Sequence, residues 1–248
     1  VTDSIQKARE TVESYLSGSA FAGAGRKIVI EEGLVGPEIS ILAITDGEKA
    51  VALSPAQDFK RLLENNSGPN TGGMGAYSPV PIVSQTLISD VLSNFIQPTL
   101  DVLATRGIDY RGVLYAGLML TDEGPKLLEY NVRFGDPEAQ VVLPRLETSL
   151  TNLLFEAANG NIETEPSFTS DAMVTVVCAT EGYPISPRTG DPITGIEAAA
   201  LSNGIEEGYV AGIDLNEDKQ PITAGGRVLA VTGRGSTIEV ARENAYIG

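Results

Sequence analysis

Residues 126–140 constrain the fold of this chain more than any other stretch, because a strand, a tight turn and a helix start follow one another within it. Residues 126–132 read as a strand, in which alternate residues share one face. Glu129 and Asn131 then point the same way, and Arg133 continues the alternation. Two oxygen ligands suit a hard cation such as Mg²⁺, and the planar fork of an arginine matches a carboxylate or phosphate. The three residues together predict a site.

The end of this stretch predicts the start of a helix. Asp136 followed by Pro137 is typical of an N-cap and the first helical position. For these two residues alone, a strand that ends, turns and caps a helix is an equally good interpretation. The sequence of this segment therefore does not decide whether Asp136 is a helix cap or a residue of the site.

A glycine-rich loop lies at 67–79, where four glycines and two prolines exclude a regular helix or strand. Glycine lets backbone N–H groups approach a ligand closely, and successive N–H groups can hold an anion. The loop fits neither the Walker pattern nor the dinucleotide fingerprint, so a plain turn remains its simplest interpretation. Just upstream, residues 57–61 form a compact charged cluster for which a solvated turn is equally simple.

Composition limits the partners and the chemistry of the chain. The 248 residues carry a formal net charge of −16, so nucleic acid and anionic membranes are poor partners. No apolar run approaches the ~20 residues needed to span a bilayer, and no secretory signal opens the chain, which predicts a cytoplasmic protein. The single cysteine, Cys178, is predicted to be a core residue of a strand over 173–178. There is no histidine, which excludes a histidine-based triad or metal site.

The remaining pattern places these motifs on secondary structure. Apolar periodicity predicts helices over 3–17, 84–106, 137–146, 149–159 and 236–246, and strands over 27–31, 38–45, 49–53, 113–120 and 126–132. The last two strands form a hairpin, Pro98 should kink the long helix, and residues 18–25 read as a loop. From about 166 the pattern changes to short strands and glycine-rich turns, which predicts a domain boundary between 1–165 and 166–248.

These segments together resemble the glycinamide ribonucleotide synthetase (phosphoribosylamine–glycine ligase) family of the ATP-grasp superfamily. The stretches 30–38, 56–61, 68–79 and 131–140 carry the match, in the family's order and spacing. The resemblance implies an α+β protein, a partial ATP-grasp fold followed by a small mixed α/β C-terminal domain. It also implies that the family's N-terminal part and last segment are absent from this chain, so that the chain alone would be inactive.

The same resemblance implies a reaction. ATP would phosphorylate the carboxylate of glycine, and the amine of 5-phosphoribosylamine would attack the glycyl phosphate, giving glycinamide ribonucleotide, ADP and phosphate in purine biosynthesis. The family requires ATP and a divalent ion, Mg²⁺ or Mn²⁺, and its substrates are small molecules.

The resemblance assigns a role to each candidate residue. It gives metal binding to Glu129 and Asn131, catalysis to Arg133, Asp136 and Lys60, substrate binding to Asp58, Gly72, Gly73, Met74, Gly75 and Arg133, and nucleotide binding to Glu31, Glu32, Leu34 and Glu38. A solvated strand end is the alternative for Glu31 and Glu32. Two other functions stay open, another ATP-grasp carboxylate–amine ligase and a non-catalytic ATP-binding fragment that lacks the missing N-terminal part.

Overall fold

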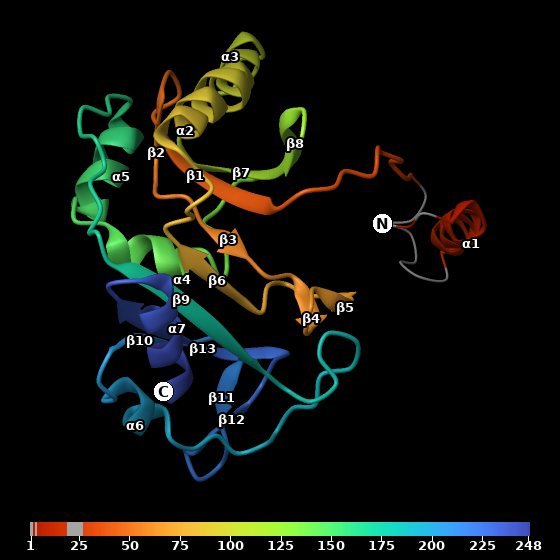
Figure 1. Ribbon diagram of the computed structural model, residues 1–248, viewed down its shortest axis with the longest axis vertical. Coiled ribbons are helices and arrows are strands. Elements are labelled where there is room, and N and C mark those ends of the chain that lie inside the picture. The colour runs from red at the N-terminus through yellow and green to blue at the C-terminus, as the bar shows by residue number, and fades with distance from the viewer. Residues whose placement is uncertain (1, 3, 19–26) are drawn as a thin grey trace.

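The computed structural model describes residues 2, 4–18 and 27–248. Helix α1 covers Ile5–Leu16, as expected, and begins at Ser4, whose side chain accepts a hydrogen bond from the Lys7 N–H. None of its residues is buried, and it lies apart from both sheets (Figure 1). The expected loop at 18–25 falls almost entirely outside the described residues.

The predicted strand at 27–31 is wrong. Residues 27–37 run as an extended connection without regular structure, and Val29 and Ile30 are 80% exposed. A strand is stabilised by the hydrogen-bonded ladder to a neighbouring strand, and no sheet of the described part of the chain pairs with this segment.

The first sheet is antiparallel in the order β2-β1-β7-β8. Its strands are β1 (Glu38–Thr45), β2 (Ala50–Ala52), β7 (Gly112–Thr121) and β8 (Gly124–Asn131). The apolar run of β1 is buried almost throughout because helices cover both faces of the sheet. The expected hairpin of β7 and β8 is confirmed, and a register shift interrupts their pairing at Gly117 and Leu118.

One long helical segment covers the first sheet, as expected from 84–106. It comprises α2 (Gln85–Val91), the π-helical turn η2 (Leu92–Ile96) and α3 (Gln97–Thr105). Pro98 lies in the first turn of α3, directly after the π-helical turn, which interrupts the regular α-helix at this point. On the other face lies α5 (Leu150–Asn159), which begins at the Ser149 cap and ends at Gly160, as predicted.

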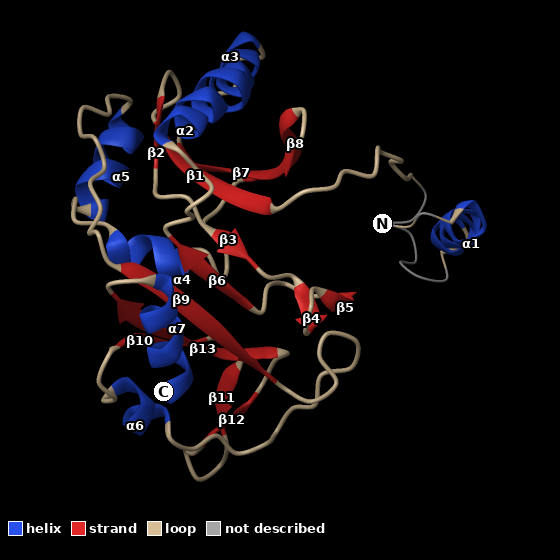
Figure 2. Cartoon of the chain, viewed as in Figure 1, coloured by secondary structure: helices blue, strands red, loops and turns tan. Residues whose placement is uncertain are grey.

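The second sheet combines strands from distant parts of the chain in the order β10-β13-β9-β6-β3 (Figure 2). They are β3 (Gln57–Asp58), β6 (Gly75–Ser78), β9 (Ala172–Ala179), β10 (Ile205–Val210) and β13 (Arg227–Gly235). Helix α7 (Ile238–Ile247) packs on it through Ala241 and Ala245, against Ala172 and Val174. Further elements are α6 (Ile196–Ala200), the pair β4 (Arg61–Leu63) and β5 (Ser67–Asn70), and the pair β11 (Ile213–Leu215) and β12 (Pro221–Thr223).

The core position predicted for Cys178 is wrong. Its side chain is exposed, although Val174 on the same face of β9 is buried. Alternate residues of a strand share a face, but the cluster that α7 forms on this face takes in Ala172, Val174 and the partly buried Val176 and not Cys178. Cys178 instead lines a pocket beside Ala245 and Tyr246, where its side chain stays exposed.

The second sheet crosses the predicted boundary at 165. Residues 126–132 and 173–178 do fall in different sheets, as the boundary requires. However, β6 pairs directly with β9, with Gly75 opposite Val176. The division into 1–165 and 166–248 remains a prediction, and the two parts share one sheet beside the site.

A buried arginine ties this junction together. Arg145, at the end of the 3₁₀ turn η3 (Leu143–Arg145), is 5% exposed. Its guanidinium donates to the Ser78 hydroxyl at 2.8 Å, to the Ser54 hydroxyl, and to the carbonyls of Thr169 at 2.9 Å and Asp171 at 2.8 Å. The cation is stable there because every bond that it forms replaces one to water.

No helix of the described residues is both long enough and apolar enough to cross a membrane.

Candidate active site

A polar pocket of about 400 Å³ is lined by residues of the first sheet and of strand β3 of the second, and it gathers most of the predicted site residues. It is lined by Glu38, Asp58, Lys60, Asn70, Thr71, Gly72, Tyr115, Leu128, Glu129, Asn131, Arg133, Asp136 and Glu138. Strands β1, β3, β7 and β8, the loop before β6 and the segment after β8 all contribute. The stretch 57–61, which sequence alone could interpret as a solvated turn, therefore lies in the same pocket as the end of β8 and the segment that follows it.

The predicted metal ligands lie side by side on β8. Asn131 donates a hydrogen bond from Nδ2 to Glu129 Oε1 at 3.1 Å, so the two side chains share one strand face. The amide nitrogen and oxygen of an asparagine are exchanged by a flip of the group, which would turn Oδ1 toward the same space as the carboxylate. Two such oxygens on the pocket wall fit a hard divalent cation.

Arg133 follows β8 and is exposed at the pocket wall. Its Nη1 donates to the carbonyl of the next residue, Phe134, at 2.9 Å. This bond uses one of five donors, so the guanidinium retains donors for an anion in the pocket.

Three charged side chains, from β1, β3 and the segment just after β3, form a second cluster in the pocket. Lys60 Nζ lies 2.8 Å from Glu38 Oε2. Burial and the nearby Glu138 carboxylate raise the pKa of Asp58 to about 6, although Lys60 opposes the shift. Burial lowers the pKa of Lys60, but the hydrogen bond to Glu38 and the charge of Asp58 outweigh it and leave that pKa raised. Glu38, expected at the nucleotide, is thus an ion-pair partner of Lys60.

Sequence reasoning missed a buried polar network behind this cluster. The Tyr115 hydroxyl donates to Glu138 Oε1 at 2.7 Å and lies 2.6 Å from the Ser40 hydroxyl. Glu138 is 4% exposed, and burial followed by its charge raises the pKa of Tyr115. Only the position of Glu138, two residues after Asp136, could have indicated it, since Tyr115 and Ser40 come from apolar strands.

The glycine-rich loop is held differently from the expected row of free donors. The Gly72 N–H donates to the Tyr183 hydroxyl at 2.9 Å, and the Gly73 N–H donates to the Thr71 hydroxyl at 3.1 Å. The Met74 N–H donates to the Phe59 carbonyl at 2.7 Å. These amides already have partners, and an anion would have to displace them.

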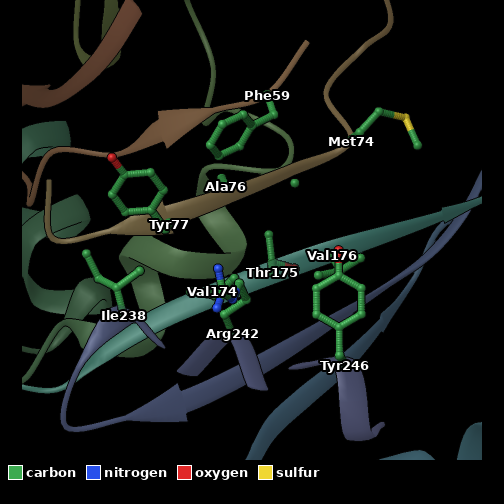
Figure 3. A pocket seen from close by; sticks show the side chains of 11 residues that line it. Phe59, Met74, Ala76, Tyr77, Val174, Thr175, Val176, Ile238, Arg242 and Tyr246 are labelled. Carbon is green, nitrogen blue, oxygen red and sulfur yellow. The ribbon is translucent and has the colours of Figure 1, made fainter. Parts of the chain in front are cut away.

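Met74 and Gly75 lie outside the polar pocket. They line a separate, largely apolar cavity of about 350 Å³ beside α7 (Figure 3). There, the rings of Phe59 and Tyr77 stand on the strand side, opposite Tyr246 of the helix. Gly73 is buried and lines neither space.

The expected nucleotide hinge is also outside the pocket. Glu31 and Glu32 are exposed, and Leu34 is only partly buried, within the extended connection that replaces the predicted strand. Of the four residues expected at the nucleotide, the structure places only Glu38 in the pocket.

The predicted helix start at Asp136 and Pro137 is wrong. Helix α4 (Ala139–Val142) begins after Glu138, and no side chain caps it. The Asp136 carboxylate instead accepts from Arg227 Nη2 at 3.1 Å and from Gln140 Nε2 at 2.9 Å. An arginine from β13, 91 residues away, therefore takes the group that a cap would use.

Comparison with known proteins identifies the family of the chain. The phosphoribosylglycinamide synthetase ATP-grasp (A) domain matches residues 1–139, and the C domain of the same synthetase matches residues 173–248. The chain belongs to the phosphoribosylglycinamide synthetase family.

Members of this family are similar over almost the whole chain. The phosphoribosylamine–glycine ligase of Streptomyces coelicolor is 47% identical over 248 residues, covering 99% of this chain and 57% of that protein. The crystal structure of phosphoribosylamine–glycine ligase from Thermotoga maritima matches with a TM-score of 0.84 and 35% identity, covering 99% of this chain and 60% of that one. The chain thus spans a little over half the length of these relatives.

The fold is therefore the expected ATP-grasp fold of the α+β class, followed by the family's C domain. A more distant structure shares it. The biotin carboxylase domain of a Hydrogenobacter thermophilus 2-oxoglutarate carboxylase, solved with MgADP, matches with a TM-score of 0.61 and 16% identity over 95% of this chain and 49% of that one. At this identity the likeness concerns the fold alone.

Proposed function

We propose that this chain forms part of an enzyme that ligates glycine to 5-phosphoribosylamine with ATP, through glycyl phosphate, in purine biosynthesis. Family membership supports the reaction. The observation that carries it is one pocket that combines Glu129, Asn131 and Arg133 with Asp58 and Lys60. Glu129 and Asn131 provide oxygen ligands for a cation, and Arg133 provides a planar guanidinium for a carboxylate. Asp58 and Lys60 add a negative and a positive charge.

The proposed reaction has two balanced steps. A carboxylate oxygen of glycine attacks the γ-phosphorus of ATP, and the bond to the bridging oxygen breaks to release ADP. The amine nitrogen of 5-phosphoribosylamine then attacks the carbonyl carbon of glycyl phosphate, phosphate leaves with the C–O bond electrons, and the nitrogen loses one proton. Both steps require a site that holds several negative charges close together.

Arg133 and Lys60 would supply that positive charge. The free donors of Arg133 suit the carboxylate of glycine and then its phosphorylated form, because a planar fork can bind two oxygens at once. Asp58, with a pKa of about 6, is charged near neutral pH. This pKa is close enough to neutral pH for the carboxylate to take the proton from the amine.

A divalent cation and the nucleotide would enter from the β8 side. Glu129 and Asn131 would hold Mg²⁺ or Mn²⁺, and a bound ion would neutralise nucleotide phosphate charge. We propose that the chain segment holding Glu31, Glu32 and Leu34 contacts the adenine, since it leads directly into β1 at Glu38, which lines the pocket.

The test is ADP release that depends on both glycine and 5-phosphoribosylamine. The assay requires a longer protein, which contains this chain and also the parts that its relatives have in addition. We expect these 248 residues alone to show no turnover. Arg133→Ala should lower kcat/KM for glycine by about 100-fold or more, since charge-assisted hydrogen bonds are worth roughly 1.5–3 kcal/mol each. Arg106→Ala, at an exposed helix end outside the pocket, is the matched control.

Two results would contradict the proposal. ADP release that is unaffected by Arg133→Ala would remove Arg133 from the site. ADP release that is supported equally well by an unrelated amine would assign the chain to another carboxylate–amine ligase.

A further inference from the structure

One side chain from the C-terminal part of the chain joins two walls of the polar pocket, the glycine-rich loop at Gly72 and the segment after β8 at Asp136. Arg227, the first residue of β13, donates from Nη1 to the Gly72 carbonyl at 2.8 Å and to the Asp136 carbonyl at 2.8 Å. Its Nη2 lies 3.1 Å from Asp136 Oδ2, which makes the second contact an ion pair. Gly72 and Asp136 both line the pocket, whereas Arg227 does not.

The same part of the chain provides a second bond to the loop. The Tyr183 hydroxyl accepts from the Gly72 N–H at 2.9 Å, so both polar groups of the Gly72 backbone are bound by side chains that lie more than 100 residues further along the chain. The Tyr183 ring packs on Gly226, where a Cβ atom would lie 2.3 Å from it. The residue before Arg227 thus also holds the tyrosine in place.

The two walls meet so closely that their relative position matters. A Cβ atom on Gly73 would lie 2.4 Å from Pro137 Cδ and 3.4 Å from the Asp136 carbonyl oxygen. The loop and the segment after β8 are therefore in direct contact, and Arg227 bonds to both sides of that contact. Its side chain is 22% exposed, less than half the value for Asp136, 51%.

We propose that Arg227 is a positioning residue for the ligation reaction. Its guanidinium fixes the Gly72 loop and Asp136 relative to each other and so sets the pocket in which Arg133 and Asn131 act. The role requires arginine, because two carbonyls and a carboxylate are bound at once by a planar fork, whereas the ammonium of a lysine is a point charge. The proposal rests on the proposed function, but the geometry that it invokes can be measured without it.

The first experiment measures turnover in the longer protein. Arg227→Ala should lower kcat by about 10- to 100-fold, as expected when reacting groups shift by about an ångström, with the KM for ATP unchanged. Guanidinium ions at non-denaturing concentration should restore part of the turnover of Arg227→Ala. The substitution Arg227→Lys should not restore turnover, because an ammonium group cannot replace the planar fork. Arg234→Ala, which removes an arginine of the same strand paired with Asp171 and Glu206, should leave kcat and its guanidinium response unchanged.

The second experiment follows amide hydrogen exchange and needs no activity. In Arg227→Ala, peptides covering residues 68–75 should exchange faster than in wild type, and in Arg234→Ala they should not. Unchanged exchange in Arg227→Ala would overturn the proposed bridge, and faster exchange with an unchanged kcat would overturn its role in catalysis. If the wild-type protein shows no ligation, the proposed function fails, while exchange still decides whether the bridge exists.

Discussion

Glu129 Oε1 accepts a hydrogen bond from Asn131 Nδ2 at 3.1 Å, across two residues of one strand. The bond shows that the alternation of β8 brings both oxygen-bearing groups to the pocket side by side. It also holds the two side chains in one arrangement, because each is the hydrogen-bond partner of the other.

Removing the negative charge of Glu129 should weaken the proposed binding of the metal ion. Glu129→Gln keeps the size of the side chain but replaces an anionic ligand with a neutral one. We expect the Mg²⁺ concentration for half-maximal ADP release to rise by about tenfold, which corresponds to roughly 1.4 kcal/mol. Glu123→Gln, at the turn of the same hairpin and paired only with Lys126, should leave it unchanged. An equal rise in both variants would argue against a metal site at Glu129.

Asp58 should make the protein less stable as the pH rises. Its pKa is raised from 3.8 to about 6 in the folded protein, so the folded state binds the proton more tightly than the unfolded state. The contribution is fully favourable below pH 4 and is lost as the pH rises through 6. Asp58→Asn should therefore match wild type near pH 4 and exceed its free energy of unfolding at pH 7 by roughly 1–3 kcal/mol.

Urea unfolding of both proteins between pH 4 and 7 measures this difference. Asp122→Asn, on the exposed turn between β7 and β8, provides the control and should give a constant difference from wild type. A constant difference for Asp58→Asn as well would show that Asp58 titrates normally.

Arg145 should be required for stability rather than for chemistry. Arg145→Ala removes the guanidinium that donates to the buried Ser54 and Ser78 hydroxyls and to two partly buried carbonyls. We expect a loss of about 3 kcal/mol or more in the free energy of unfolding, measured by urea denaturation, against a few tenths for exposed Arg106→Ala. A loss no larger than that control would mean that water replaces the guanidinium at no cost.

Gly73→Ala should separate the two walls of the pocket. The new methyl group would lie 2.4 Å from Pro137 Cδ, at a backbone φ of +112°. Gly190→Ala carries a similar φ of +90° but meets nothing within 4 Å, so both variants share the backbone strain of about 1 kcal/mol. The melting temperature of Gly73→Ala should be clearly lower than that of Gly190→Ala. Equal melting temperatures would show that the loop can move away from Pro137 freely.

Much of the site could be predicted from sequence because its signals are local. Glu129, Asn131 and Arg133 follow the alternation of one strand, and the β7–β8 hairpin follows from two apolar runs around a turn. The pairing of Asp136 with Arg227 could not be predicted, since it joins residues 91 apart and competes with a local cap that the sequence favours. The Tyr115–Glu138 bond likewise depends on how two elements pack.

Two errors have a common physical cause. Residues 27–31 have the composition of a strand, and Cys178 has the surroundings of a core residue, but both outcomes depend on a neighbour. No strand of the described residues pairs with the first, and the second stays outside the cluster that α7 packs on β9. Apolar patterning records which residues can be buried, and the tertiary arrangement decides which ones are.

The pairing of Gly75 with Val176 also fixes an order of events during synthesis. Strand β6 carries the end of the glycine-rich loop, and its neighbours in the sheet are β3 and β9. Because a contact between residues so far apart must close a long stretch of chain, it forms late compared with the local β7–β8 hairpin. The wall that holds Glu129 and Asn131 can therefore fold while the chain is still emerging from the ribosome, but the opposite wall must wait until β9 and then Arg227 have been made.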